Sequence, residues 1–378
     1  MADVLTMRER WEQLLGTKTG CLTASHIQPL FPISQRGATI LINAAVFATP
    51  EITKQVTALQ PGQKLLAGEI LIAAHTDTPS FIFGKTGDEV AGFSGVTFEG
   101  EVKILSNVWD LFSLNDYALR LDFQQLTAGR QSQPIPEDVS FRGNVDQIFL
   151  EAGAIIQPGC IINAATGPVY IGKDAEVMEG SLLRGPVALG DHAVLKMGAK
   201  VYGATTIGPG CKVGGEVNNV VFFANSNKGH DGFLGNAVIG EWCNLGADTN
   251  CSNLKNNYDE VKIWSEDKNR AVKTGLQFCG LLMGDHSKCG INTMFNTGTV
   301  VGVSANIFGS NFPEKYIPSF SWGGSEGMQT YDFTKAMATA DRMMGRRNLK
   351  MTEAETTMYR HLFDQSASLR EFHFKLSN

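Results

Sequence analysis

Residues 171–213 read IGKDAEVMEGSLLRGPVALGDHAVLKMGAKVYGATTIGPGCKV, and a branched aliphatic residue recurs in this stretch at every sixth position. The members of the series are Ile171, Val177, Leu183, Leu189, Leu195, Val201, Ile207 and Val213. A period of six fits neither a helical turn nor a single strand, but it is typical of a parallel β-helix in which each hexad forms one flat face. This spacing therefore predicts a β-solenoid.

Apolar residues at the same spacing continue on both sides of this stretch. Ile155 and Ile161 precede it, and later members are Ile239, Leu245, Met283, Cys289, Phe295, Val301 and Ile307. Stacked coils bury one apolar residue per face, so we expect the breaks in the series to be insertions that loop out and carry functional groups. The 41 glycines fit tight corners with positive φ.

The composition bounds the class of protein. A net charge of −6, from 32 basic and 38 acidic residues, argues against a nucleic-acid partner. The N-terminus lacks a basic, apolar leader and the chain has no long apolar run, so we expect no membrane partner and a cytoplasmic location. The seven dispersed cysteines include no CxxC pair, which predicts reduced structural thiols and no metal site.

We expect three segments: an α/β domain over residues 1–137, the solenoid over 138–322 and a helical segment over 323–378. Apolar periodicity predicts helices over 4–15 and 114–126 and strands over 39–43 and 69–73. A polar, proline-bearing linker follows at 127–138. From residue 331 onward, helical spacing predicts two helices that pack on the solenoid or on a neighbouring subunit.

One dense basic cluster lies in this helical tail and comprises Arg342, Arg346, Arg347 and Lys350. Such a cluster is either the solvated end of a helix or a site for the phosphates of a bound cofactor. The sequence leaves both interpretations open.

Two motifs indicate a function. Residues 227–240 read NKGHDGFLGNAVIG and residues 244–254 read NLGADTNCSNL. Together they resemble the acetyltransferase domain of the bifunctional glucosamine-1-phosphate acetyltransferase/N-acetylglucosamine-1-phosphate uridylyltransferase family, over roughly residues 150–310. The resemblance implies a left-handed β-helix that assembles as a homotrimer and binds acetyl-CoA between adjacent solenoids.

The resemblance also implies roles for individual residues. His230 matches the general base that takes a proton from the sugar amine, a task suited to a neutral imidazole. Asn253 matches a second catalytic residue, and Asn244 matches an asparagine that positions the amino sugar. The structural alternatives are a loop histidine for His230 and an asparagine ladder for Asn253.

Further positions concern the two substrates. Ala247, Gly290 and Ile291 match acetyl-CoA contacts of the family. Among the sugar-binding positions, Lys196 replaces an Arg, Asn218 replaces a Lys and Phe233 replaces a Tyr that many members carry. Lys196 keeps the charge but loses the bidentate fork. The implied acceptor is therefore an amino sugar or amino sugar phosphate that need not be glucosamine 1-phosphate.

The N-terminal third resembles the nucleotidyltransferase half of the same proteins, and the segments that carry this resemblance are 4–12, 41–44 and 107–112. The glycine-rich G-x-G-T-R loop that would cradle nucleotide phosphates is absent from the sequence. Either this activity has been lost, or the chain starts downstream of the first strand. Mg²⁺ is expected only if this site is active.

Three functions follow from these patterns. We expect an acyl-CoA-dependent N-acyltransferase with His230 as its base. The first alternative is a sugar-1-phosphate nucleotidyltransferase whose solenoid serves assembly or regulation. The second is a decayed sugar-nucleotide-binding or scaffold protein.

Overall fold

The computed structural model describes residues 4–33, 39–77 and 86–377. The chain forms two compact units. The first contains residues 107–351 and 362–378 with the start of the chain, and the second contains residues 5–106 and 352–361. The expected segment limits near residues 137 and 322 both lie within the first unit.

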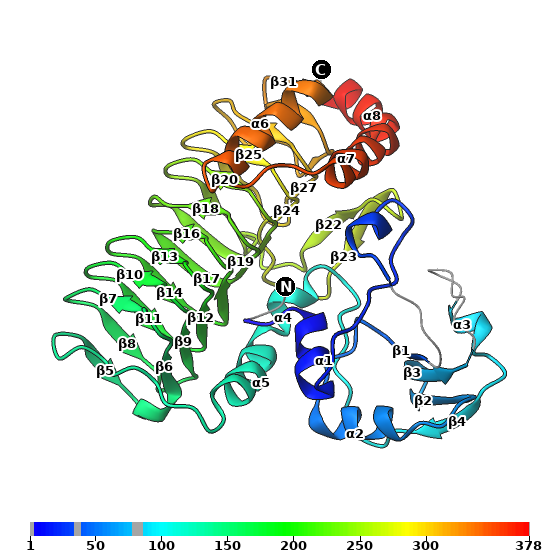
Figure 1. Cartoon of the computed structure of the whole chain (residues 1–378). Coiled ribbons are helices and arrows are strands. Elements are labelled where there is room, and N and C mark those ends of the chain that lie inside the picture. Colours follow the sequence, from blue (N-terminus) through cyan, green and yellow to red (C-terminus); the bar gives the residue numbers. More distant parts are fainter. Residues whose placement is uncertain (1–3, 34–38, 78–85, 378) are drawn as a thin grey trace. The chain divides into compact units, whose positions relative to one another are not determined.

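The first unit contains the predicted parallel β-solenoid (Figure 1). All eight residues of the hexad series are at most 2% exposed. They stack in columns, because Leu189 pairs with Ile171 below it and with Ile207 above it. Each buried aliphatic side chain contributes roughly 1.5–3 kcal/mol of burial free energy. The six-residue period therefore reflects one continuous core.

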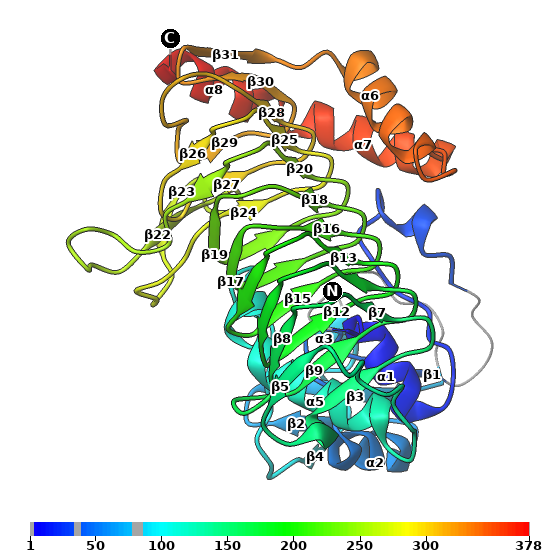
Figure 2. The same cartoon turned by 90° about the vertical axis from the view of Figure 1, so that its left-hand side faces the viewer.

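Three faces surround this core, and Figure 2 shows the strands of one face in a row. That face consists of β7 (Ile155–Ile156), β10 (Glu176–Val177), β13 (Val194–Leu195), β16 (Lys212–Val213), β18 (Asn227–Lys228), β20 (Asn244–Leu245), β25 (Lys288–Cys289), β28 (Asn306–Ile307), β30 (Ser321–Gly324) and β31 (Gly327–Thr330). The second consists of β5 (Ser140–Arg142), β8 (Ile161–Asn163), β11 (Leu182–Arg184), β14 (Lys200–Tyr202), β17 (Glu216–Phe222), β19 (Phe233–Ile239), β24 (Leu282–Met283), β27 (Val300–Val301) and β29 (Tyr316–Ile317). The third consists of β6 (Ile148–Leu150), β9 (Val169–Ile171), β12 (Val187–Leu189) and β15 (Thr205–Ile207), and β21 (Asn250–Cys251) pairs separately with β26 (Met294–Phe295).

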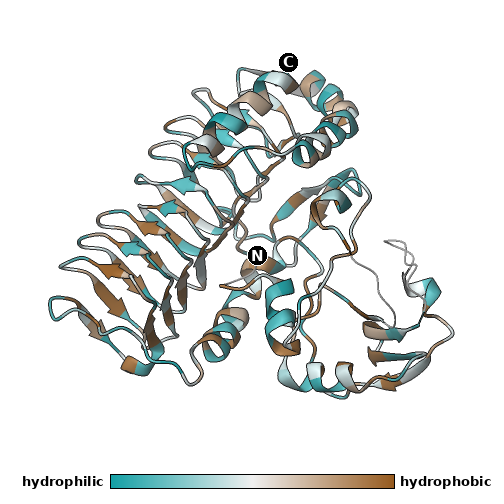
Figure 3. Ribbon diagram, in the orientation of Figure 1, coloured by the Kyte–Doolittle hydropathy of each residue, from teal (hydrophilic) through white to brown (hydrophobic). Residues whose placement is uncertain are grey.

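The predicted register is wrong in the first coil. Ile155 and Ile161 are 51% and 45% exposed, whereas the residues that follow them are buried. Ile162 is the buried residue that stacks beneath Leu183. Ile171 follows Ile162 by nine positions instead of six, because the corner between them is longer. The longer corner shifts the six-residue series of buried positions. Figure 3 shows that hydrophobic residues predominate in the strands of these first coils.

The two main breaks in the series differ in kind. Val213 pairs with Lys228, 15 residues later, whereas Leu195 pairs with Val213, 18 residues later. The first break is therefore a shortened coil, and the expectation of an insertion there was wrong. Strand β17 runs straight where the coil below is split into β14 and β15. The second break is an insertion that carries the hairpin of β22 (Lys262–Ser265) and β23 (Arg270–Lys273).

Helices cover the third face of the solenoid. These are α4 (Asp110–Ser113) and α5 (Asn115–Thr127). Leu119 and Phe123 of α5 pack against the outward-facing Phe149, Tyr170 and Ala188. The side chain of Asn115 donates to the carbonyl oxygen of Ala204 at 2.6 Å. The outward residues of this face are buried for this reason.

The C-terminal tail forms three helices, α6 (Phe333–Gly345), α7 (Glu353–Gln365) and α8 (Ala367–Ser377), where the sequence predicted two. Only Ser366 separates α7 from α8, so the helical spacing gives no sign of the break. The Arg370 guanidinium lies 4.4 Å from the ring centre of Phe363 and donates to the Ser319 carbonyl at 3.2 Å. The tail thereby packs on the last coil of the solenoid.

The second unit is a small α/β unit. It contains α1 (Met7–Leu15), η1 (Gln28–Leu30), α2 (Pro50–Ala58), α3 (Thr86–Glu89) and a sheet of order β1 (Thr39–Ile42), β3 (Ile70–Thr76), β2 (Gln63–Ala67), β4 (Ser94–Thr97). Thr6 and Glu9 form a capping box at the start of α1. The Trp11 indole donates to the Val46 carbonyl at 3.0 Å and lies in the core. The predicted first helix and both predicted strands are present.

Every helix in the described ranges is too short or too polar to span a membrane.

Candidate functional site

A hollow of about 540 Å³ lies at the solenoid corner that follows β13, β16, β18 and β20. It brings together three of the residues singled out in the sequence, namely Lys196, His230 and Ala247. The turns supply the rest of its lining, which is Met197, Gly214, Gly215, Gly229, Asp231 and Asp248. His230 is exposed on the short turn between β18 and β19. Its imidazole is therefore accessible to a ligand in the hollow.

A strip of glycines runs along this corner. The strands β16, β18, β20 and β25 are each followed by a glycine, and these are Gly214, Gly229, Gly246 and Gly290. A Cβ on Gly246 would lie 2.4 Å from the carbonyl of Gly290 and 2.6 Å from the nitrogen of Ile291. Only glycine permits this close stacking. The structure thus places Gly290 and Ile291 directly beside Gly246–Ala247, on the coil next to the hollow.

A buried lysine supports the turn that carries His230. Lys228 is 1% exposed and occupies a core position above Val213. Its ammonium group donates to the carbonyl oxygens of Gly214 and His230, each at 3.0 Å. Burial lowers the pKa of Lys228 to about 8, against the opposing effect of the Asp231 and Asp248 carboxylates. Lys228 was not identified from the sequence, because its place among the buried positions can be assigned only when the coil is known to be shortened.

A second group of predicted residues lies on the outward face of β17 and β19, next to the turn of His230. Asn218 pairs in register with Gly235. A Cβ on Gly235 would lie 2.6 Å from the Asn253 amide nitrogen and 2.7 Å from the Phe233 ring. Asn218, Phe233 and Asn253 therefore gather around a glycine that leaves room for them. Asn244 lies apart from this group, on the face formed by β18 and β20.

Asn253 also belongs to an asparagine ladder. Its amide nitrogen donates to the Asn236 side-chain oxygen at 2.8 Å. With the Asn219 amide oriented to satisfy both of its ends, Asn236 donates to Asn219 at 2.9 Å and Asn219 donates to the carbonyl oxygens of Phe112 and Ala204. The structural role considered for Asn253 is thus present, and any catalytic role would be additional.

The basic cluster of the tail is divided by the fold. The Arg347 guanidinium lies 6.0 Å from the ring centre of Trp242, at another corner of the solenoid. Arg342 donates instead to the Thr339 hydroxyl of its own helix at 3.1 Å. Trp242 in turn stacks on His286 at 6.2 Å. At least Arg347 is therefore a packing residue.

The cysteines offer no activated thiol in the core. Six of the seven are buried, and all seven are free. Burial raises the pKa of the Cys211 thiol to about 12, which keeps it protonated at neutral pH. Among the described residues, no group of three or more His, Cys, Asp or Glu side chains is placed to hold a metal ion.

Comparison with known proteins supports both halves of the resemblance. Residues 2–131 match the family described as "Sugar nucleotidyl transferase". The bifunctional protein GlmU of Methanococcus maripaludis (strain S2) is 28% identical over 217 residues, which cover 57% of this chain and 45% of that protein. An uncharacterized acetyltransferase, YaiX of Escherichia coli O6:K15:H31, is 26% identical over 161 residues, which cover 42% of this chain and 69% of that protein.

Among solved structures, an Arabidopsis UDP-N-acetylglucosamine acyltransferase aligns over 63% of this chain and 92% of its own, with 15% identity and a TM-score of 0.25. The chain spans less than half the length of the GlmU relative. The resemblance to sugar nucleotidyltransferases and to bifunctional proteins of the GlmU type is confirmed, at low identity.

Proposed function

We propose that this protein is an acyl-CoA-dependent N-acyltransferase that transfers an acetyl group to the amine of an amino sugar or amino sugar phosphate. The observation that carries the proposal is the hollow in which His230 faces a strip of glycine backbone. The names of relatives, which include acetyltransferases, support the same reaction class.

The chemistry follows from the imidazole. In the neutral form, His230 accepts a proton from the acceptor ammonium group, so that the amine nitrogen can attack the thioester carbonyl carbon. A C–N bond forms and the C–S bond breaks. The proton that His230 took up passes to the departing sulfur, which leaves as free CoA, and the second proton that the nitrogen loses as the amide forms is released to water. Lys228 positions the base by fixing the carbonyl of His230. In this scheme acetyl-CoA lies along Ala247, Gly290 and Ile291.

The acceptor would lie on the outward face beside the hollow. Phe233 offers an apolar surface to the sugar ring, and Asn218 and Asn253 offer amide groups to its hydroxyls. Lys196, in the lining of the hollow, supplies a positive charge for a phosphate. Asn244 lies on the adjoining face, formed by β18 and β20, and would contact the ligand from that face. In this proposal His230 and Asn253 act on the reacting groups and the remaining residues bind.

A homotrimer would complete this site. Large apolar side chains are exposed beside the same corner, including Met197 at 69% and Ile291 at 70%. A second solenoid placed against them would cover apolar surface and would enclose the open hollow. Light scattering at micromolar concentration should give the mass of a trimer, and a monomer would contradict this assembly.

Nucleotidyl transfer by the N-terminal unit is a second candidate, because residues 2–131 match the sugar nucleotidyl transferases. Against it stands the absence of a glycine-rich phosphate loop from the sequence.

A thiol-release assay tests the proposed function. Acetyl-CoA is incubated with the protein and a panel of amino sugars, amino sugar phosphates and nucleotide-linked amino sugars, and free CoA is measured. We expect release that depends on an acceptor amine and is absent with the matching N-acetylated compounds. Release no faster with any amine than with these controls would contradict the proposal.

A further inference from the structure

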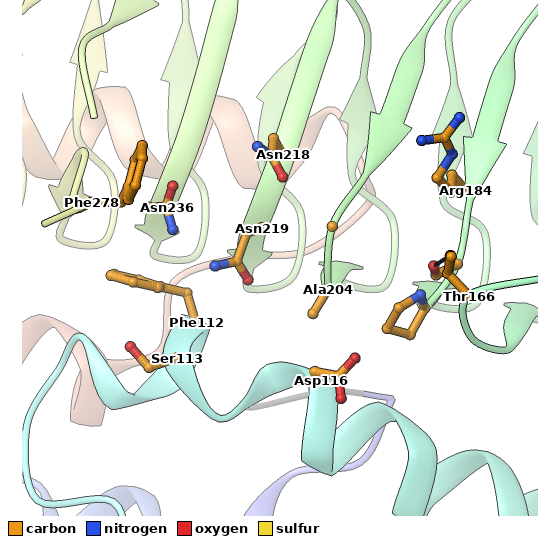
Figure 4. Close-up of a pocket in the computed structure, with 13 residues that line it drawn as sticks. Phe112, Ser113, Asp116, Thr166, Arg184, Ala204, Asn218, Asn219, Asn236 and Phe278 are labelled. Carbon is orange, nitrogen blue, oxygen red and sulfur yellow. Dashed lines mark hydrogen bonds between the residues drawn. The ribbon is translucent and has the colours of Figure 1, made fainter. Parts of the chain in front are cut away.

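A second pocket lies in the first unit, between α4–α5 and the outward face of the solenoid (Figure 4). Its volume is about 560 Å³, within the range of roughly 300–1,000 Å³ typical of small-molecule sites. The residues that give it chemical character are Phe112, Asp116, Arg184, Asn218, Asn236 and Phe278. Of these residues, only Asn218 was proposed from the sequence as a site residue.

The two ends of this pocket differ in chemistry. Phe112 and Phe278 lie at one end and Arg184 at the other, as Figure 4 shows. Phe278 is 43% exposed, so its ring is accessible to a ligand in the pocket. Arg184 is exposed and makes no ion pair with any of the described residues. The pocket thus offers an aromatic contact and a cation to one ligand.

The remaining charge in the pocket is balanced. Asp116 accepts two hydrogen bonds from Arg120, at 2.9 and 3.0 Å. Arg120 also donates to the Thr166 carbonyl at 2.7 Å, so the pair is held in place. An anion near Arg184 would therefore meet an acidic group whose charge is already compensated.

The dimensions favour an elongated ligand. Arg184 belongs to β11, and the strands β14 and β17 separate it from Asn236 on β19. Three strand spacings correspond to about 14 Å along the solenoid. A sugar 1-phosphate is too short to contact both ends. An aromatic base, a ribose and a diphosphate joined in one molecule can do so.

The pocket is continuous with the acceptor face of the proposed function. Asn218 lines the pocket and pairs with Gly235, around which Phe233 and Asn253 gather. The ladder bond from Asn253 to Asn236, at 2.8 Å, links the same two regions. The end of the pocket nearest this face is therefore the Asn236 end, and Arg184 lies three strands away from it.

We propose that this pocket binds a nucleoside diphosphate. The base contacts Phe278 at one end, and the diphosphate contacts Arg184 at the other. Nucleotide binding here does not depend on the proposed function, because His230 and the hollow around it take no part in it.

Calorimetric titration of the full chain tests this assignment without acetyl-CoA. The probes are UDP, dTDP, GDP and ADP, with glucosamine 1-phosphate and inorganic phosphate as comparisons. We expect at least one nucleoside diphosphate to bind at least about tenfold more tightly than glucosamine 1-phosphate. Arg184→Gln should weaken its binding by about 10- to 100-fold, as expected for a charge-assisted contact. Phe278→Ala should weaken it by about 5- to 100-fold through loss of base stacking.

Matched controls separate the possible outcomes. Arg142→Gln alters an exposed arginine in the same outward row, because Arg142 and Arg184 both pair with Asn163, and it should leave nucleotide affinity unchanged. His230→Ala should also bind the nucleotide normally. Binding that is insensitive to both Arg184→Gln and Phe278→Ala would place the nucleotide elsewhere in the chain and overturn the assignment, as would no binding at millimolar concentration. Nucleotide binding here without acyl transfer would instead refute only the proposed function.

Discussion

The two units of the chain preserve different parts of the same resemblance. The match to sugar nucleotidyl transferases covers residues 2–131, which comprise most of the second unit together with α4 and α5 of the first, yet the sequence has no glycine-rich G-x-G-T-R loop for a triphosphate. The chain matches two relatives at only 26–28% identity, yet its solenoid unit gathers His230, Lys196 and Ala247 in one hollow. Resemblance in sequence and the grouping of reactive side chains are thus separate kinds of evidence about the reaction.

The largest contrast between the units should be in catalysis itself. We expect no nucleotidyl transfer, because the sequence lacks the G-x-G-T-R loop whose glycine amides and basic residue would hold a triphosphate. Pyrophosphate release from UTP or dTTP with a sugar 1-phosphate and Mg²⁺ is the measurement. Release above a no-enzyme control would show that the N-terminal unit holds the nucleotide in another way.

His230→Ala should lower the turnover number for acyl transfer by about 10²- to 10⁴-fold, the usual contribution of a positioned general base. Affinity for CoA should persist, because the glycine strip that would hold it is unchanged. The control is His192→Asn, an exposed histidine with positive φ at a different corner, where asparagine tolerates the backbone conformation. Near-normal turnover of His230→Ala on its best acceptor would leave the hollow without its base.

Lys228 should give the solenoid unit a distinctive pH dependence. Burial lowers the pKa of Lys228 in the folded chain to about 8, below the ordinary lysine value of 10.5, so between these two pH values the unfolded chain binds more protons than the folded chain. The free energy of unfolding of the wild type should therefore rise with pH across this window, relative to Lys228→Met, by about 3 kcal/mol.

Urea unfolding at pH 7 and at pH 10.5 measures this difference. Lys212→Met removes an exposed lysine from the neighbouring strand, and its free energy of unfolding should change with pH as that of the wild type does. A wild-type and Lys228→Met pair whose difference stays constant with pH would contradict the buried, ion-pair-free placement of this ammonium group.

The smallest predicted effect concerns acceptor choice. Asn218→Lys combined with Phe233→Tyr restores two side chains of the resembled family and should raise kcat/KM for glucosamine 1-phosphate by about tenfold or more, since a hydrogen bond to a charged group contributes roughly 1.5–3 kcal/mol. Steady-state kinetics with that acceptor is the measurement. If the double variant folds normally and gains nothing, the residue correspondence on this face is misplaced.

The solenoid was predictable because its core repeats. Each hexad places one aliphatic residue inside, so Ile171 to Val213 could be assigned to the core from spacing alone. The prediction failed where corner length changes, as between Ile162 and Ile171, because an altered corner shifts the phase without leaving a local signal. The core position of Lys228 was hidden for the same reason.

The site was only partly predictable. The turn motif identified His230 and Ala247, and the structure places both at one hollow. The motif gave no sign of the second pocket, because Arg184, Asn236 and Phe278 come from coils far apart in sequence and meet α4–α5 only through stacking and helix packing. Such a site depends on tertiary contacts that no linear spacing encodes.

A crystal structure of the protein with bound acetyl-CoA, or with a non-hydrolysable analogue, would show where the thioester lies relative to His230. We expect the thioester in the hollow of Lys196, His230 and Ala247, with the pantetheine arm along Gly246 and Gly290. A thioester bound at any other corner of the solenoid, away from His230, would contradict it.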